Sequence, residues 1–499
     1  MQHFQQPVMP DLPWLEGGAR KLLIGGQWQA AQSGATLPTY DPATGRHLAD
    51  VAAGDATDVA LAVAAARGAL EGEWARVKPF ERQEMMLRLA DLVDRHHEEL
   101  ILLDCLEMGA PISHLRPRKR RALGLIRYYA GAATMLLGET VENSAPAGTF
   151  LTYTRKEPVG VVAAIIPWNA PITSAIWKVA PVLATGCTMV LKPSEEASLS
   201  SLRLAELVLE AGVPPGVVNV ITGYGRSAGA ALADHPGVDK IAFTGSVPTG
   251  QGIMRAAAGT LKRVTLELGG KSPNVVFNDA DLDRAAQGAA AACFLNTGQI
   301  CNAGTRLFVQ EGVADDFAQR VADLGSAMRL GHGLDPATQL GPLVSRGQFD
   351  KVCGYLQQGR EQGAQALSGG AALTEGGFGS GYFVPPTVFT DVRDDMTIAR
   401  EEIFGPVLSV LTFRNEEELV RRANGTVFGL AAGVWTEQVG RAHRVAAALK
   451  AGTVWVNTYH MTDVAMPFGG YGMSGIGRES GRESLEAYLQ TKAVWVRTD

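Results

Sequence analysis

One cysteine of the sequence stands among polar residues that suit covalent chemistry. Cys301 follows Gln299 and Ile300 and precedes Asn302, and Glu267 lies upstream, ahead of two glycines. A thiolate can attack a carbonyl carbon, and a carboxylate close to it can activate water. The alternative for any single cysteine is a small buried hydrophobe. The other four cysteines fit that alternative: Cys105, Cys187, Cys293 and Cys353.

Composition limits the classes of protein that the chain can belong to. It has 499 residues, 46% of them hydrophobic, and a formal net charge of -6. This length predicts several domains or one large two-lobed unit. The acidic balance argues against nucleic acid as a partner, and no apolar run is long enough for a membrane helix. The scattered cysteines and the absence of a signal-like N-terminus predict a reduced, cytoplasmic protein.

A short basic run, Arg116 to Arg121, is the exception to the acidic balance. We interpret it as a solvated surface or an intersubunit salt-bridge patch, and the alternative is a site for a phosphate or another polyanion. The sequence shows no obvious pair of arginines for a substrate that carries a carboxylate.

Strands and helices alternate through most of the chain. Residues 80–108 have the apolar spacing of one long helix, and from 159 onward short apolar runs alternate with helical segments. This pattern predicts βαβ units and parallel sheets, arranged as two α/β lobes joined near Gly269 and Gly270. Two alternating segments, 149–156 and 493–497, are predicted to pair as a small appendage that buries an edge against another subunit.

Polar residues follow successive predicted strands of the first lobe. Asn169 comes after strand 159–166, Lys192 and Glu195 after strand 188–191, and Glu267 near the end of strand 263–268. Carboxyl ends of parallel strands share one edge of a sheet, and ligands bind in the crevice there. After strand 240–243, Gly245 and Ser246 open a helix whose N-terminus suits pyrophosphate, although the segment is not GxGxxG.

Seven motifs in order give the chain a close resemblance to the NAD(P)-dependent aldehyde dehydrogenase superfamily, over nearly its whole length. The order and spacing are most similar to the non-acylating, tetrameric branch. The motifs are Pro167-Trp168-Asn169, Lys192-Pro193-Ser194-Glu195, Phe243-Thr244-Gly245-Ser246, Glu267-Leu268-Gly269-Gly270-Lys271, Gly298-Gln299-Ile300-Cys301, Glu402-Ile403-Phe404-Gly405-Pro406 and Pro467-Phe468-Gly469-Gly470.

The resemblance implies a fold with two doubly wound parallel-sheet lobes and a small β oligomerisation appendage. The Rossmann-like NAD-binding domain would comprise residues 1–139 and 160–268. The catalytic domain would comprise 269–478, and the oligomerisation segment 140–159 and 479–499. The assembly expected from the resemblance is a homotetramer, with a homodimer as the alternative.

The resemblance also assigns roles to residues of the site. Cys301 would be the nucleophile, Glu267 the water-activating base, and Asn169 an oxyanion donor together with the Cys301 backbone N–H; Lys178 and Glu479 would relay protons. The residues implied to hold the cofactor are Ile165, Ile166, Pro167, Trp168, Lys192, Glu195, Gly225, Phe243, Gly245, Ser246, Leu268, Gln348, Lys351, Glu402 and Phe404. Glu195 would favour NAD over NADP by repelling a 2′-phosphate, and Arg226 could soften that preference so that NADP is tolerated. No metal is expected.

The substrate side is the least specific part of the resemblance. Residues matching the aldehyde tunnel are Ala170, Ser174, Trp177, Ile300, Asn302, His460, Met461 and Phe468. Ala170 and Ser174 are smaller than in many relatives, and the other side chains are mostly apolar. These residues imply a medium-to-large apolar or aromatic aldehyde, whereas His460 and Asp463 would be polar contacts or solvated loop residues.

The function implied is oxidation of an aldehyde by NAD to a carboxylic acid, through a thiohemiacetal and a thioester on Cys301. One alternative is an acylating dehydrogenase that passes the acyl group to coenzyme A, against which Glu267 argues. Another is a structural protein that reuses the fold, although such a protein often loses the thiol or the base.

Overall fold

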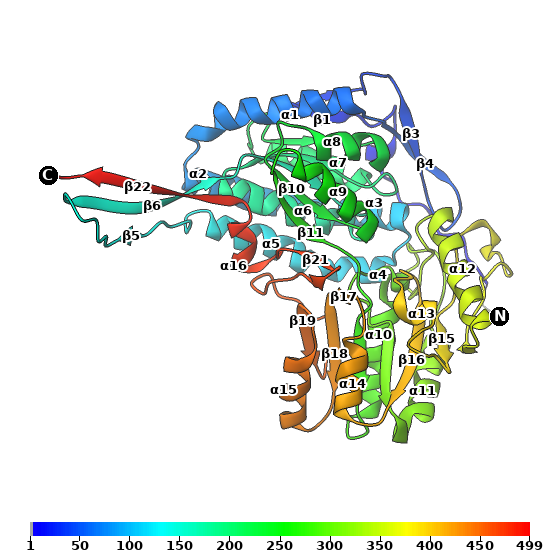
Figure 1. The fold of residues 1–499 in the computed structure, drawn as a ribbon. Coiled ribbons are helices and arrows are strands. Elements are labelled where there is room, and N and C mark those ends of the chain that lie inside the picture. The colour runs from blue at the N-terminus through cyan, green and yellow to red at the C-terminus, as the bar shows by residue number, and fades with distance from the viewer. Residues whose placement is uncertain (1–2) are drawn as a thin grey trace.

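The computed structural model describes residues 3–499 as two α/β lobes and a long arm of three strands, two of them long (Figure 1). The first lobe is built on an eight-stranded sheet in the order β2-β1-β9-β8-β7-β10-β11-β21, whose five strands from β9 to β11 run parallel. The strands are β1 (Leu22–Ile24), β2 (Gln27–Gln29), β7 (Val161–Ile165), β8 (Thr188–Lys192), β9 (Val218–Val220), β10 (Lys240–Thr244), β11 (Arg263–Glu267) and β21 (Gly475–Ile476).

Helices cover both faces of this sheet. Its buried strands are apolar on both faces, as parallel strands between helices must be; successive residues of β7 alternate between two separate cores. One face packs against α1 (Ala56–Glu71), α8 (Ala230–Asp234) and α9 (Val247–Ala258). The other packs against α2 (Pro79–Arg95), α3 (His97–Met108), α5 (Lys119–Ala132), α6 (Pro171–Thr185) and α7 (Leu199–Glu210).

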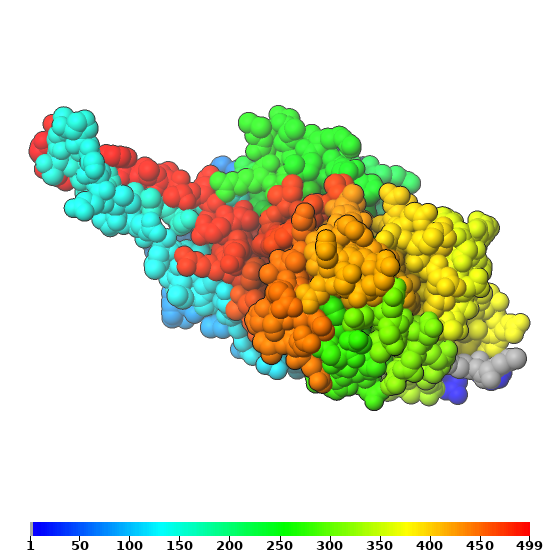
Figure 2. Space-filling model, turned by 60° about the horizontal axis from the view of Figure 1, so that its bottom comes forward, coloured from blue at the N-terminus to red at the C-terminus, as the bar shows by residue number. Residues whose placement is uncertain are grey.

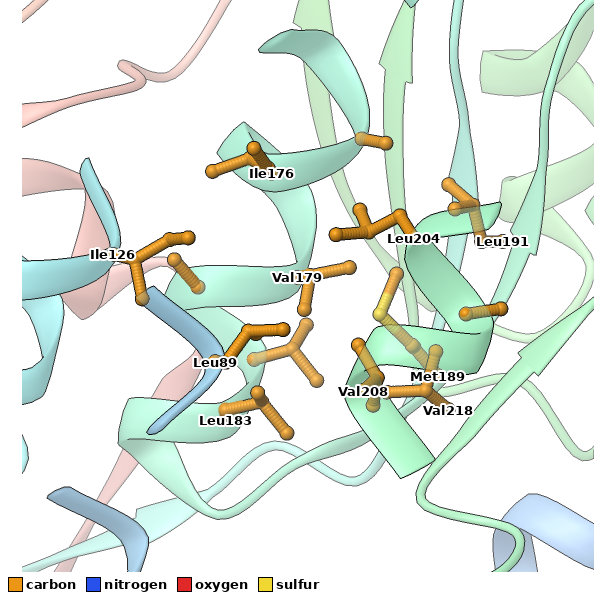
Figure 3. Close-up of a cluster of buried hydrophobic side chains, with 14 of the residues drawn as sticks. Leu89, Ile126, Ile176, Val179, Leu183, Met189, Leu191, Leu204, Val208 and Val218 are labelled. Atoms are coloured by element: carbon orange, nitrogen blue, oxygen red, sulfur yellow. The ribbon is translucent and has the colours of Figure 1, made fainter. Parts of the chain in front are cut away.

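Figure 3 shows how the second of these cores fixes the helices. Ile126 of α5 lies beside Ile176 and Val179 of α6, and Leu204 of α7 reaches Leu191 of the sheet. Burying one such side chain contributes about 1.5–3 kcal/mol to the free energy of unfolding. The core therefore sets the register of α5 and α6, two helices that carry residues discussed below.

The predicted helix over residues 80–108 was wrong in one respect, since it is two helices that meet at His96. The backbone of His96 ends α2 and begins α3. The break allows its Nδ1 to lie 3.1 Å from Glu99 and from an Arg203 guanidinium nitrogen. Between β9 and β10 the chain forms a π turn at Gly225–Gly229, which continues directly into α8.

The second lobe is built on a seven-stranded sheet, β14-β15-β16-β13-β12-β18-β19, which is parallel except for β14. Its strands are β12 (Pro273–Val276), β13 (Arg306–Gln310), β14 (Gln365–Ser368), β15 (Thr387–Thr390), β16 (Val407–Phe413), β18 (Ala431–Trp435) and β19 (Thr453–Val456). Its helices are α10 (Leu282–Phe294), α11 (Ala314–Ser326), α12 (Arg346–Glu361), α13 (Thr397–Arg400), α14 (Glu416–Ala423) and α15 (Val439–Ala448).

The chain then returns to the first lobe. β20 (Tyr471–Gly472) pairs with β17 (Phe428–Gly429), β21 joins the edge of the first sheet beside β11, and α16 (Gly481–Glu486) follows. The arm is β22 (Leu489–Arg497) paired antiparallel with β6 (Phe150–Pro158), with β5 (Thr140–Val141) on its other side. The pairing predicted between segments 149–156 and 493–497 is confirmed, and Figure 2 shows the arm projecting far from the body.

Shorter elements complete the chain: β3 (Thr36–Tyr40), β4 (His47–Ala52), α4 (Ile112–Leu115) and the 3₁₀ turns Pro13–Leu15, Trp74–Arg76, Arg116–Arg118, Leu295–Gly298, Glu311–Val313 and Phe378–Ser380. Within residues 3–499, no helix has the length and apolarity to cross a membrane. The same residues hold no cluster of His, Cys, Asp and Glu side chains arranged to bind a metal ion.

Candidate active site

A crevice with about 640 Å³ of open space lies between the two lobes. It is lined by the ends of several strands of the first sheet and by loops of the second lobe. Its walls are Pro167, Trp168, Asn169, Thr244, Gly245, Ser246, Glu267, Leu268, Gly269, Cys301, Gln348, Lys351, Glu402 and Phe404. Asn169 and Glu267, expected at the carboxyl edge of the first sheet, are therefore brought to one place with Cys301 of the second lobe, whereas Lys192 and Glu195 lie outside this lining.

Cys301 lies in a loop whose backbone is held in an uncommon conformation. Asn296 and Thr297 have φ of 54° and 57°, and Gly298 has φ of 70°. A Cβ on Gly298 would stand 2.1 Å from the carbonyl oxygen of Gly405, so only glycine fits. Positive φ at non-glycine residues stores strain that the surroundings must hold, and such strain is common at functional sites.

The Cys301 thiol is neutral in this environment. Burial raises its pKa to about 12, with a further contribution from the charges of Glu402 and Glu267, and backbone N–H groups of Asn302 and Cys301 act in the opposite direction. A thiol with such a pKa needs a base to become a nucleophile. Glu267 and Glu402 are the carboxyl groups that line the same crevice and are close enough to influence the thiol.

Asn169 presents its side-chain amide to the crevice. Its Nδ2 donates to the carbonyl of Gln299 at 2.8 Å, and its own carbonyl accepts from Asn296 at 3.2 Å. The first of these bonds uses the Asn169 side chain and the second its backbone carbonyl, and together they tie the end of β7 to the loop that carries Cys301. The second N–H of the Asn169 amide is available to an oxygen bound beside the thiol.

Glu267 ends β11, and its carboxylate is buried without a hydrogen-bond partner among residues 3–499. Burial raises its pKa well above the ordinary range, and the positive charges of Lys178 and Arg478 oppose this only in part. The Oε1 atom of Glu267 lies beside Gly469, and a Cβ added to Gly469 would stand 2.7 Å from that oxygen. A carboxylate desolvated in this way is a stronger base than a surface one.

Lys178 and Glu479 lie behind Glu267. Lys178, on α6, forms an ion pair with Glu479 and donates to Thr244 Oγ1 at 2.9 Å. Burial lowers the pKa of Lys178 to about 7, and the charge of Glu267 opposes this. The pair therefore lies within electrostatic reach of the base, in a position that suits a role in moving its proton.

Lys192 ends β8, and Glu195 follows it in the wall of a second pocket, beside Glu196 and Ser345. Lys192 is buried and donates from Nζ to Glu195 Oε2 at 3.1 Å, and the Gly225 N–H donates to Glu195 Oε1 at 3.3 Å. Burial acts to raise the pKa of Glu195, but the charge of Lys192 and these hydrogen bonds leave it lowered. Glu195 is thus a fixed, ionised acceptor whose side chain is 34% exposed, as needed for two ribose hydroxyls.

Gly245 and Ser246 bring a helix N-terminus to the crevice. Ser246 caps α9, whose first N–H groups have no intrahelical partner and suit a pyrophosphate. A Cβ on Gly245 would meet the ring of Phe243 at 2.5 Å, and one on Gly250 would meet Leu268 at 2.8 Å. Phe243 and Leu268 are buried, and their side chains lie directly against Gly245 and Gly250 at this helix N-terminus.

Glu402, Phe404, Gln348 and Lys351 form part of the crevice wall that the second lobe supplies. Glu402 Oε1 accepts from the Gly270 N–H at 3.0 Å, and the charge of Lys351 acts on the same carboxylate. Gln348 donates to the carbonyls of Ile403 and Phe404 at 3.2 and 2.7 Å, so its amide holds this loop. The ring of Phe404 packs edge-on against Trp168, with centroids 5.3 Å apart.

Ile165 and Ile166 are buried at the end of β7, where Ile166 N–H donates to the Lys192 carbonyl at 3.1 Å. They support Pro167 and Trp168 in the wall of the crevice. With the Glu195 carboxylate at one end, the α9 N-terminus in the middle and Glu402 at the other, the residues present fit NAD.

The aldehyde side is bounded by α6 and the loop before Phe468. Trp177 and Phe468 contact each other at 5.6 Å between ring centroids. Ser174 and Asn302 are buried, Ala170 and Ile300 half-buried, and Met461 is 65% exposed. His460 is packed against Trp455 and Tyr459 with Nε2 buried, so the solvated alternative was wrong for it; Asp463 is exposed.

Three contributions to the site were not predicted. Thr244 was seen only as part of a motif, yet its hydroxyl accepts from Lys178. Gly269 was seen as a hinge, but a Cβ there would meet Glu402 Oε2 at 2.0 Å. Arg121 belongs to the basic run that we interpreted as a solvated or intersubunit surface, with a polyanion site as the alternative; it lies over Trp177 with 4.6 Å between its guanidinium carbon and the ring centroid, a contact that no pattern in the sequence signalled.

A thiol, a buried carboxylate and a dinucleotide-sized crevice between two α/β lobes define a nucleotide-dependent oxidoreductase. Comparison with known proteins narrows this class. A sequence profile of the aldehyde dehydrogenase family matches residues 28–494. The chain is 48% identical over 484 residues to the Bacillus subtilis protein DhaS, named as an aldehyde dehydrogenase, covering 97% of this chain and 96% of that one.

Solved structures agree. The NAD+ complex of an aldehyde dehydrogenase from Bacillus cereus is 46% identical, covers 100% of both chains and superimposes with a TM-score of 0.95. Betaine aldehyde dehydrogenase of Staphylococcus aureus is 37% identical, with 99% of this chain and 97% of that chain covered and a TM-score of 0.95. The chain belongs to the aldehyde dehydrogenase family. It is an enzyme that oxidises aldehydes, and its cofactor is NAD.

Proposed function

We propose that the enzyme converts an aldehyde to a carboxylic acid through a covalent adduct on Cys301. The observation that carries this proposal is the buried, unbonded Glu267 carboxylate in the crevice that Cys301 also lines. A desolvated carboxylate is suited to take a proton first from the thiol and later from water.

The bond changes follow from these positions. Cys301 Sγ attacks the aldehyde carbon, and its proton passes to Glu267. The carbonyl oxygen becomes an oxyanion, stabilised by the Asn169 amide and the Cys301 backbone N–H; one such donor is typically worth about 3–4 kcal/mol. Collapse of this thiohemiacetal expels hydride from the substrate carbon and leaves a thioester. NAD supplies the acceptor for that hydride when it is bound.

Water completes the reaction. Glu267 takes a proton from a water molecule, whose oxygen attacks the thioester carbon while the C–S bond breaks. The carboxylic acid leaves and the thiol is restored. The ion pair of Lys178 and Glu479 is placed to carry the proton of Glu267 onward, since Lys178 acts on the charge of Glu267 and its own pKa lies near 7.

The presence of Glu267 favours hydrolysis over transfer of the acyl group to coenzyme A. For substrate we propose an aldehyde with an apolar or aromatic body, because Trp177, Phe468 and Ile300 bound the approach to the thiol. The arm formed by β6 and β22 exposes apolar side chains such as Trp495 and Leu151, so we propose that it joins subunits, in a homotetramer as the family resemblance implies or in a homodimer as the alternative. The five unpaired cysteines of the described residues suit a reducing compartment, so we propose the cytoplasm.

The test is the pair Glu267→Gln and Cys301→Ala, assayed by stopped-flow absorbance of NADH with an aldehyde and no coenzyme A. Glu267→Gln is expected to give at most one equivalent of NADH per site and then stall, because the thioester forms more slowly without the base that takes the thiol proton and is then not hydrolysed. Cys301→Ala is expected to give no burst. A normal steady state in Glu267→Gln, or a requirement for coenzyme A, would contradict the proposal.

A further inference from the structure

Two arginines beside the aldehyde end of the crevice have no anionic partner. Arg118 and Arg121 are three residues apart, one just before α5 and one in its first turn. Within residues 3–499, neither guanidinium forms an ion pair with a carboxylate. Two neighbouring basic side chains are paired, Arg116 with Glu98 at 2.6 Å and Lys119 with Asp94 at 2.5 Å, whereas Arg120 is exposed to solvent.

Arg121 is tied to the substrate side by contacts on two elements. Its guanidinium lies over the Trp177 ring of α6 at 4.6 Å and donates to Thr462 Oγ1 at 3.1 Å. Trp177 in turn contacts Phe468, whose neighbour Gly469 lies against the Glu267 carboxylate. A continuous set of contacts thus runs from Arg121 to the base. Figure 1 shows α5 on the side of the first lobe that faces the second lobe.

Arg121 also lies within electrostatic reach of the nucleophile. Burial and the charge of Arg118 lower the pKa of Arg121 to about 10, whereas a thiolate at Cys301 acts to raise it. The guanidinium therefore remains charged at neutral pH. The guanidinium and the thiol are therefore close enough to interact through their charges.

The surroundings do not compensate these two charges. Positive charge at a helix N-terminus is unfavourable, and the two guanidinium groups repel each other. The carboxyl group that acts on Arg118 is Asp104, whose own pKa burial raises to about 7. His114 and His460 nearby are uncharged at neutral pH, because burial lowers the pKa of both imidazoles. An anion at this place would therefore be stabilised by two partly desolvated cations and a helix N-terminus.

We propose that Arg118 and Arg121 bind a carboxylate carried by the substrate, so that the preferred substrates are aldehydes with an apolar body and a carboxylate at the end remote from the aldehyde group. This inference rests on the proposed function, since it needs the aldehyde to lie at Cys301. It makes the proposed substrate class more specific. Trp177 and Phe468 would contact the apolar or aromatic body of the substrate, and the two arginines would contact the carboxylate at its outer end. The planar guanidinium matches a carboxylate with two parallel hydrogen bonds.

The experiment compares matched aldehydes with saturating NAD. 4-Carboxybenzaldehyde is set against its methyl ester, and an ω-carboxyalkanal against the alkanal of equal chain length; the readout is the ratio of kcat/KM between each charged and neutral partner. The wild-type ratio is expected to exceed 10. Arg121→Gln and Arg118→Gln are each expected to lower it about 10- to 100-fold, as for loss of a charge-assisted hydrogen bond, mainly through KM. Arg121→Lys should retain part of the preference.

Arg120→Gln is the matched control, because Arg120 is exposed on the same turn; its ratio should equal that of the wild type. A wild-type ratio near 1, or an equal fall for charged and neutral aldehydes in Arg121→Gln, would overturn the inference and leave Arg121 as a packing residue. If the wild-type enzyme still oxidises the neutral aldehydes normally, either of these results leaves the proposed function intact. Absence of NADH with every aldehyde, or full activity of Cys301→Ala, would instead overturn the proposed function.

Discussion

Lys178 forms an ion pair with Glu479 in which both side chains are almost fully buried, 1% and 5% exposed. The pair links a helix of the first lobe to the segment that returns from the second, directly behind the catalytic crevice. Because charge is costly to bury, a paired and buried lysine beside an unbonded carboxylate points to a use for its charge. We propose that this use is to set the proton affinity of Glu267, whose pKa the charge of Lys178 lowers.

The pH dependence of turnover should report this coupling. Glu267 acts as a base only when ionised, and its pKa is raised by burial and lowered by Lys178. The steady-state kcat should therefore rise with pH through that raised pKa. Lys178→Met removes the opposing positive charge, so we expect the rising limb to move to higher pH by about 1 unit. Glu479→Gln removes a negative charge and should move it to lower pH. Two shifts of the same sign would contradict an electrostatic coupling.

Cofactor choice should depend on the Glu195 carboxylate. Lys192 and the Gly225 N–H hold it ionised and in place. In Glu195→Gln, the ribose loses a charged acceptor and a 2′-phosphate no longer meets a negative charge. We expect KM for NAD to rise about 10-fold and KM for NADP to fall, with Arg226 next to Gly225 available to the phosphate. Initial rates with each cofactor measure this. Glu210→Gln, an exposed carboxylate at the end of α7, should change neither value.

The alternation of strands and helices was readable from sequence because it depends on local patterns. Strand 240–243 and the helix that follows it are nearly as predicted, since a buried parallel strand is apolar on both faces. The break at His96 was not readable, because it is fixed by contacts with Arg203, about a hundred residues away. Strands β12 and β15 and helix α12 were also missed, since short or mixed segments take their structure from tertiary packing.

The residues of the candidate site likewise fall into those that could be placed from the sequence and those that could not. Asn169, Glu195 and Glu267 could be placed because each follows a predicted strand, and the edge of a parallel sheet is a known location for ligands. Arg121 could not, because a basic run at the start of a helix has the same pattern whether it faces water or a substrate. Only its stacking on Trp177 and its lack of a carboxylate partner separate the two cases.

The arm should govern assembly. Trp495 is 58% exposed and Leu151 is 49% exposed on paired strands of the arm, in the absence of any covering element. A charge at such a position would be buried if another subunit covers it. We expect Trp495→Asp to shift a homotetramer to a smaller species in light scattering after size exclusion, and Thr491→Asp, at an exposed polar site on the same strand, to leave the mass unchanged. An unchanged mass in Trp495→Asp would show that the arm does not hold the assembly.

The close approach of Gly269 to Glu402 should make this glycine essential for cofactor binding. A Cβ there would lie 2.0 Å from Glu402 Oε2, so Gly269→Ala must displace the carboxylate from the Gly270 N–H. Loss of a charge-assisted hydrogen bond of this kind typically costs about 1.5–3 kcal/mol. We therefore expect Kd for NAD, measured by quenching of tryptophan fluorescence, to rise about 10- to 100-fold. Gly252→Ala is the matched control, because a Cβ at Gly252 in α9 meets no atom within 4 Å. Its Kd should match the wild type, and alanine in a helix interior should even raise the melting temperature. Equal Kd values for the two variants would mean that Glu402 does not contact the cofactor.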